Sequence, residues 1–82
     1  MESRDEIRLT VLRTLAPLYS EGRYVTVSEF QKRLPSHDAR TITKFVSVLH
    51  TAGILTKAGS RRDASWQLTE GGYALARAEL NI

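Results

Sequence analysis

Two short amphipathic segments joined by a tight turn constrain the fold of this chain more than any other feature. The first segment opens with Thr26 and Glu29, a capping-box pair, and continues with apolar residues at helical spacing. The second begins about three residues after the first ends, with Asp38 as its expected N-cap and Ser36 as the alternative. It ends at Gly53, a residue type common in the left-handed position after a helix. This spacing predicts a helix-turn-helix unit.

The second helix, residues 38–53, is amphipathic. Its expected buried stripe consists of Ile42, Phe45, Val46 and Leu49. Its opposite face is short, polar and basic, and consists of Arg40, Thr41, Thr43, Lys44 and Ser47. Between Ala39 and Arg62 the chain has five basic residues and no acidic one, as expected for a helix that enters a DNA groove. Taken alone, the stretch fits an ordinary solvated helix equally well.

Val48 on this helix is predicted to be exposed, where it could contact a thymine methyl group. A minor packing role under the following hairpin is the alternative.

The segment after this helix predicts a two-stranded β-hairpin. Residues 54–58 and 64–68 read as strands, and the loop between them carries Arg61 and Arg62 at its tip. Lys57 lies on the first strand. Strand alternation makes Trp66 the expected anchor of the hairpin to the core; a stacking platform for single-stranded bases is a weaker alternative.

Apolar helices are predicted at both ends of the chain, with a short edge strand at Tyr24-Val25 after the first. The first starts near Arg4 and should kink or end at Pro17, with Gly22 as the final stop. The last follows Thr69 as N-cap and carries two apolar faces, which favours a homodimer; a single broad face packed on the first helix is the alternative. The candidate dimer contacts are Leu9, Leu18, Leu75 and Ile82.

The composition limits the classes of function. The 82 residues suit one domain, 1–82, with little core to spare for a buried catalytic site. The net charge is +3, yet residues 30–62 hold seven of the twelve basic residues and one of the nine acidic ones, which suits a polyanionic partner. There is no cysteine, and His37 and His50 form no metal or catalytic pattern, so we expect no enzyme, metal or cofactor. No apolar run approaches the ~18 residues of a membrane span, and a cytoplasmic, DNA-associated protein is expected.

The order of these elements resembles the winged helix-turn-helix DNA-binding domain. This fold class is mainly α with a small β-hairpin: a three-helix core, a two-stranded wing and a C-terminal helix. Residues 41–49 followed by Ala52-Gly53-Ile54-Leu55 look like the recognition helix and first wing strand of MarR-type and PadR-type regulators, and Leu68-Thr69-Glu70-Gly71-Gly72 looks like the turn after their wing. The chain departs from the pattern at Ser60, where MarR-type wings usually have an aspartate that braces the wing.

The resemblance implies a small transcriptional regulator or repressor that binds double-stranded DNA. Helix 38–53 would read the major groove, and wing 56–66 would contact the backbone or minor groove through Lys57, Arg61 and Arg62. The chain is too short for the long terminal helices with which MarR-type proteins dimerise and bind ligands, so no small-molecule effector is implied. The alternatives are a winged-helix module for protein–protein interaction in a larger assembly and a DNA-binding accessory factor in replication or partition.

Overall fold

Short local signals set most of the secondary structure of this chain. The computed structural model describes residues 3–59 and 64–82. In that part of the chain, the helices and strands follow the order α1 (Ser3–Tyr19), β1 (Val25–Thr26), α2 (Val27–Arg33), α3 (Ala39–Thr51), β2 (Leu55–Ala58), β3 (Ser65–Leu68) and α4 (Glu70–Leu80). Thr26, Asp38 and Thr69 each accept a hydrogen bond from a backbone N–H three residues ahead, so the three expected N-caps are confirmed.

The β-sheet has three antiparallel strands in the order β1-β3-β2, where the hairpin alone would supply two. Val25 of β1 pairs with Trp66, and β2 pairs with β3 from Leu55↔Leu68 to Ala58↔Ser65. The expectation of a two-stranded wing beside a three-helix core is therefore inexact, because the expected edge strand β1 joins the sheet as a third strand and the expected C-terminal helix α4 packs on α1. Pairing with β1 gives the second edge of β3 backbone partners that the hairpin cannot provide.

Helix α1 continues two residues beyond Pro17, to Tyr19. Pro17 lacks a backbone N–H and so removes one helical hydrogen bond, and only two helical residues follow it. The chain then turns through Gly22 at φ +67°. This left-handed conformation favours glycine and supports the predicted stop there.

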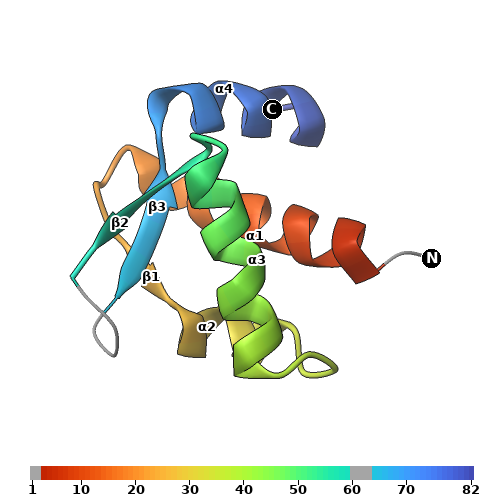
Figure 1. Ribbon diagram of the computed structural model, residues 1–82. Helices are drawn as coiled ribbons and strands as arrows, with labels where there is room; N and C mark the ends of the chain where they lie inside the picture. The colour runs from red at the N-terminus through yellow and green to blue at the C-terminus, as the bar shows by residue number, and fades with distance from the viewer. Residues whose placement is uncertain (1–2, 60–63) are drawn as a thin grey trace.

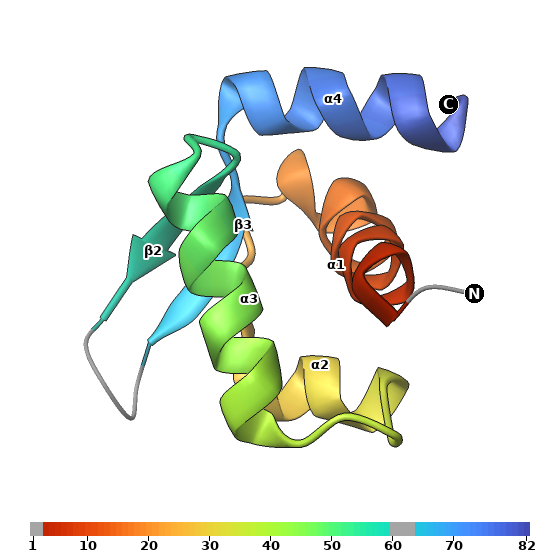
Figure 2. The ribbon, with the colours of Figure 1, turned by 45° about the vertical axis from the view of Figure 1, so that its right-hand side comes forward.

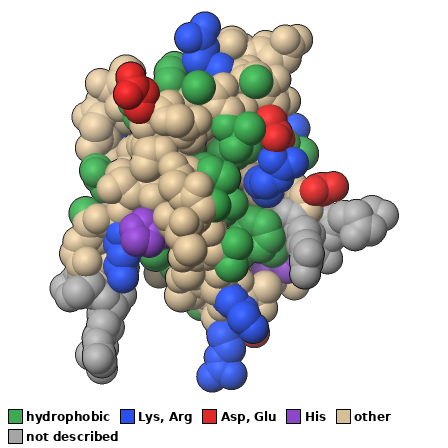
Figure 3. All heavy atoms as spheres, turned by 45° about the horizontal axis from the view of Figure 1, so that its top comes forward, with side chains coloured by type: hydrophobic (Ala, Val, Ile, Leu, Met, Phe, Trp, Pro, Cys, Tyr) green, Lys and Arg blue, Asp and Glu red, His purple; other side chains and the backbone are tan. Residues whose placement is uncertain are grey.

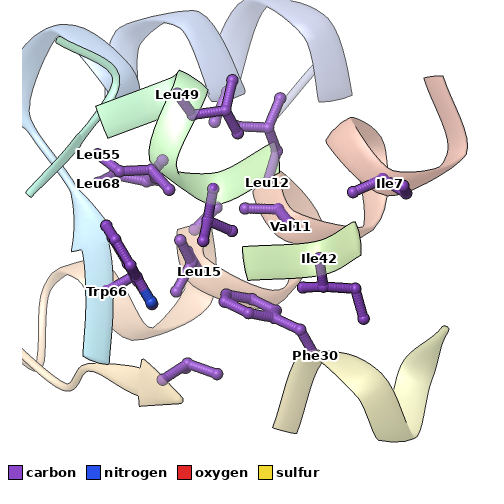
Figure 4. Packing of buried hydrophobic residues seen from close by; sticks show 14 of the residues in the cluster. Ile7, Val11, Leu12, Leu15, Phe30, Ile42, Leu49, Leu55, Trp66 and Leu68 are labelled. Carbon is purple, nitrogen blue, oxygen red and sulfur yellow. The ribbon is translucent and has the colours of Figure 1, made fainter. Parts of the chain in front are cut away.

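The hydrophobic core lies where α1, α2 and α3 meet the sheet (Figure 4). Helix α1 supplies Val11, Leu12 and Leu15, and α2 supplies Phe30, all fully buried. Trp66 and Leu68 close the core from β3, as expected for the anchoring strand. In Figures 1 and 2, α3 runs beside the β2–β3 hairpin, and Figure 2 shows α1 on its other side.

Helix α4 lies across one end of the molecule and packs on α1 (Figure 2). The rings of Tyr19 and Tyr73 stack with centroids 4.2 Å apart, and Arg8 forms an ion pair with Glu79. Ala76 is fully buried in this contact. Much of the apolar surface of α4 is thus covered within the chain.

Candidate nucleic-acid interface

Both ends of α3 are fixed by specific hydrogen bonds. At its start, the Asp38 carboxylate accepts a hydrogen bond from the Thr41 backbone N–H at 2.8 Å, and this bond holds the pKa of Asp38 below its usual value. At its end, Gly53 has φ +83°, and the N–H groups of Gly53 and Ile54 donate to the carbonyls of His50 and Leu49. These two hydrogen bonds form a Schellman cap, which sets where the helix ends.

The buried and exposed faces of α3 follow the predicted stripe. Ile42, Val46 and Leu49 are buried, and Phe45 is half-buried against the core. All six residues predicted to face DNA are exposed: Arg40, Thr41, Thr43, Lys44, Ser47 and Val48. Helix α3 itself contains no acidic residue. The helix therefore presents a polar and basic outer surface held rigidly by its inner one.

None of the ion pairs between described residues involves Arg40, Lys44 or Lys57. Other basic residues do have acidic partners, as Arg33 does with Glu29. The cations of α3 and β2 are thus available to an external anion.

The wing strands pack on α3 through Trp66. Trp66 is 3% exposed, and the His50 ring meets its ring edge-on at a centroid distance of 5.7 Å. The Lys57 Nζ lies 5.6 Å from the centre of the same ring, within the range of a cation–π contact. Trp66 is an anchor, as predicted, and its burial leaves no open ring face for stacking with bases. Arg61 and Arg62, together with Ser60, lie outside the described residues, so their roles stay predictions.

Gln67 is a buried polar residue that the sequence did not single out. Its side chain is 3% exposed, and its Nε2 donates to the Arg23 carbonyl at 2.7 Å. Its Oε1 accepts from the Leu68 backbone N–H at 2.6 Å. The residue links the wing to the turn after α1, and strand alternation alone, which places it opposite Trp66, could not reveal this.

The two flanks of α3 face different surroundings. One flank borders a hollow between α2, α3 and β3 whose lining includes Thr43 and Trp66. The other flank borders a shallow hollow lined by Lys44, Ser47, Val48, Thr51 and Ala52. Val48, at 60% exposed, therefore lies on the flank away from the wing, and the alternative that it packs under the hairpin is wrong. Thr51 and Ala52 were missed, although each lies four residues after a residue that the helical spacing had placed on this surface.

The two histidines form no site together. His37 lies in the turn between α2 and α3 and has a largely buried side chain. Its Nε2 lies 3.3 Å from Glu6 Oε1, and this contact ties the turn to α1. His50 is exposed and contacts Trp66. Among the described residues there is no group of three or more His, Asp or Glu side chains that could hold a metal ion. In that same part of the chain, every helix is too short or too polar to cross a membrane.

The four candidate dimer contacts do not lie on one common surface. Leu9 and Ile82 line the same hollow between α1 and α4, together with Pro17 and Leu80. Leu18 lines two other hollows along α1, and Leu75 is half-buried. The structure therefore brings together two of the four residues. Figure 3 shows apolar side chains interrupted by charged ones over the end of the molecule that carries α4.

Comparison with known proteins supports the fold. No protein-family model and no curated protein sequence matches the chain. Among solved structures, a point mutant of Lactococcus lactis ZitR is similar, with a TM-score of 0.65 and 19% sequence identity. The chain has a winged-helix-like fold. The similar region covers 88% of this chain and 49% of the ZitR chain, so the chain spans about half the length of that neighbour. The narrower resemblance to MarR-type and PadR-type regulators stays a prediction.

Proposed function

We propose that this protein is a sequence-specific DNA-binding regulator that inserts α3 into the major groove. The observation that carries the proposal is the outer face of α3, which is exposed, basic and free of acidic side chains along the helix. The winged-helix-like fold that the chain shares with ZitR is compatible with this class of function.

The chemistry of the α3 face matches the edges and backbone of a duplex. Arg40 and Lys44 can donate to guanine O6 and N7 or to phosphate oxygens, and the hydroxyls of Thr41, Thr43 and Ser47 can donate or accept. Small side chains between the long ones let the helix backbone come close to the bases. The fixed caps and the packed inner face hold these groups in one arrangement.

The wing would add contacts outside the major groove. Lys57 is exposed on β2 next to the loop, and Arg61 and Arg62 are proposed to reach the phosphate backbone or the minor groove. Together with Arg40 and Lys44 they make five cations per protomer. If all five neutralise phosphates, log affinity should fall against log salt concentration with a slope of about −4 to −5.

One such module offers few base contacts, so we propose that two copies bind a palindromic site as a homodimer. A repressor is the simplest regulator of this kind, because a bound dimer can exclude other proteins from the DNA.

Fluorescence anisotropy of labelled duplexes, titrated at several salt concentrations, tests the proposal. Lys44→Ala and Arg61→Ala should each weaken binding and reduce the magnitude of the salt slope by about 1 per protomer. Arg77→Ala, on the exposed surface of α4, removes the same charge away from α3 and should change neither quantity. If Lys44→Ala and Arg61→Ala bind DNA as the unmodified protein does, the proposal is wrong. Recovery of one stoichiometric protein partner without DNA would favour an interaction module instead.

A further inference from the structure

Val48 is an exposed apolar residue in the middle of a polar helix face. It is 60% exposed, whereas Ile42, Val46 and Leu49 on the core side of α3 are buried. It does not belong to the hydrophobic core or to the residues packed around the core. The wing lies on the other flank of α3, so within the described chain no element covers it.

Val48 lines a shallow and mostly apolar hollow on α3, which we call the methyl pocket. Its lining residues are Lys44, Ser47, Val48, Thr51 and Ala52. The valine and alanine side chains are wholly apolar, and the threonine can add a third methyl-bearing surface. The pocket is open to solvent and lies on the same outer face as Arg40 and Lys44.

We propose that the methyl pocket receives the 5-methyl group of a pyrimidine in the major groove. Thymine and 5-methylcytosine both carry this group, and it is the only apolar group on the major-groove edge of a base pair. The inference rests on the proposed function, since it requires α3 to lie in the major groove. It goes further by naming which feature of the base α3 selects on this flank.

The position of the methyl pocket favours DNA over a protein partner. A stable protein interface needs about 800 Å² on each side, far more than one valine, one alanine and one threonine on a single helix can supply. The lysine in its lining has no acidic partner among the described residues, which suits a polyanion. A pyrimidine methyl group needs contact with only one or two apolar side chains, and a cationic group beside them can bind the neighbouring base or phosphate.

The test compares duplexes that differ only in pyrimidine methyl groups. A site selected from random DNA is prepared with uracil in place of thymine, one position at a time, which removes the methyl group and preserves base pairing. Burying one methyl group is worth about a four-fold change in affinity. We therefore expect uracil at one position of each half-site to weaken binding about four-fold. A second series, with 5-methylcytosine in place of cytosine, should strengthen binding to a similar extent if the selected site has cytosine at that position.

Variants assign the effect to the methyl pocket. Val48→Ala should bind the methylated and unmethylated duplexes with nearly equal affinity, because it removes the contact. Tyr24→Ala truncates another exposed apolar residue outside α3. It should leave the ratio of the affinities for the methylated and unmethylated duplexes unchanged. Unaltered affinity in both base series, for a protein that binds its selected site specifically, would overturn this inference and leave the proposed function intact. Failure to select any DNA would instead overturn the proposed function.

Discussion

Gly72 shows how a single residue can fix the junction between α3 and α4. A Cβ atom at this position would lie 2.0 Å from the backbone oxygen of Ile54, too close for any side chain. The Thr69 Oγ1 donates to the Gly53 carbonyl at 2.6 Å and accepts from the Gly72 N–H at 2.9 Å. The start of α4 is thus held directly against the turn that ends α3, and only glycine permits this approach.

Gly71 and Gly72 therefore have opposite expected responses to alanine. Gly72→Ala should lower the free energy of unfolding by about 1–3 kcal/mol, because backbone atoms must move apart to admit the methyl group. At Gly71 an added Cβ meets nothing within 4 Å. Gly71→Ala should be neutral or raise the free energy of unfolding by up to about 1 kcal/mol, through better helix propensity. Urea denaturation followed by circular dichroism measures both, and equal effects of the two substitutions would contradict the close approach at Gly72.

At the scale of the helix, α3 depends on the ionised Asp38 carboxylate at its N-terminus. The pKa of Asp38 is lowered from 3.8, chiefly by the hydrogen bond that it accepts from the Thr41 N–H. A carboxyl group with a lower pKa in the folded state stabilises the protein above its unfolded pKa, and this contribution is lost as the pH falls through the folded pKa. The start of α3 should therefore weaken in acid, below about pH 3.8.

Asp38→Asn keeps an N-cap acceptor that does not titrate. The difference in urea midpoint between the unmodified protein and this variant should be constant near neutral pH. As the pH falls below about 3.8, the urea midpoint of the unmodified protein should fall more than that of the variant. A difference that does not change with pH would show that the charge of Asp38 contributes nothing to the cap.

Local signals explain why the elements could be predicted and the sheet only in part. The N-caps Thr26, Asp38 and Thr69 act within three residues, so a sequence pattern contains both partners of each bond. The pairing of Val25 with Trp66 joins residues far apart in the chain. Its register depends on how the core packs, and a two-residue strand carries too little pattern to specify it.

The candidate interface was predictable to a similar degree. Helical periodicity alone separates the exposed residues of α3 from the buried ones, because one packed stripe fixes the opposite face. Which flank faces the wing depends on the tertiary position of Trp66, so the surroundings of Val48 needed the structure. The contact of His37 with Glu6 is likewise long-range, and no spacing in the sequence indicates it.

At the scale of the whole molecule, α3 is the proposed DNA-binding surface, and α1 and α4 form the surface proposed for dimer contacts. Tyr73 and Ala76 of α4 pack against the rest of the chain, and Tyr73 stacks on Tyr19 of α1. This packing agrees with the alternative that α4 has a single broad apolar face covered by α1. Leu9 and Ile82 nevertheless lie around one apolar hollow, and Ile82 is 62% exposed. We therefore propose this hollow, whose lining also includes Arg13 and Glu79, as the place where a second copy would pack.

Ile82→Arg tests the dimer, because it places a charge in this hollow without touching the core. If the two copies meet here, sedimentation should show a shift from dimer to monomer, while the urea midpoint at low protein concentration should stay near that of the unmodified protein. Affinity for a palindromic site should then fall much more than affinity for a single half-site, since only the palindrome engages two copies of α3 at once. A variant that sediments and binds both DNAs as the unmodified protein does would place any dimer contact elsewhere on the molecule. Equal losses on both DNAs would mean that the substitution disturbs α3 itself, which the separation of the α1–α4 hollow from α3 argues against.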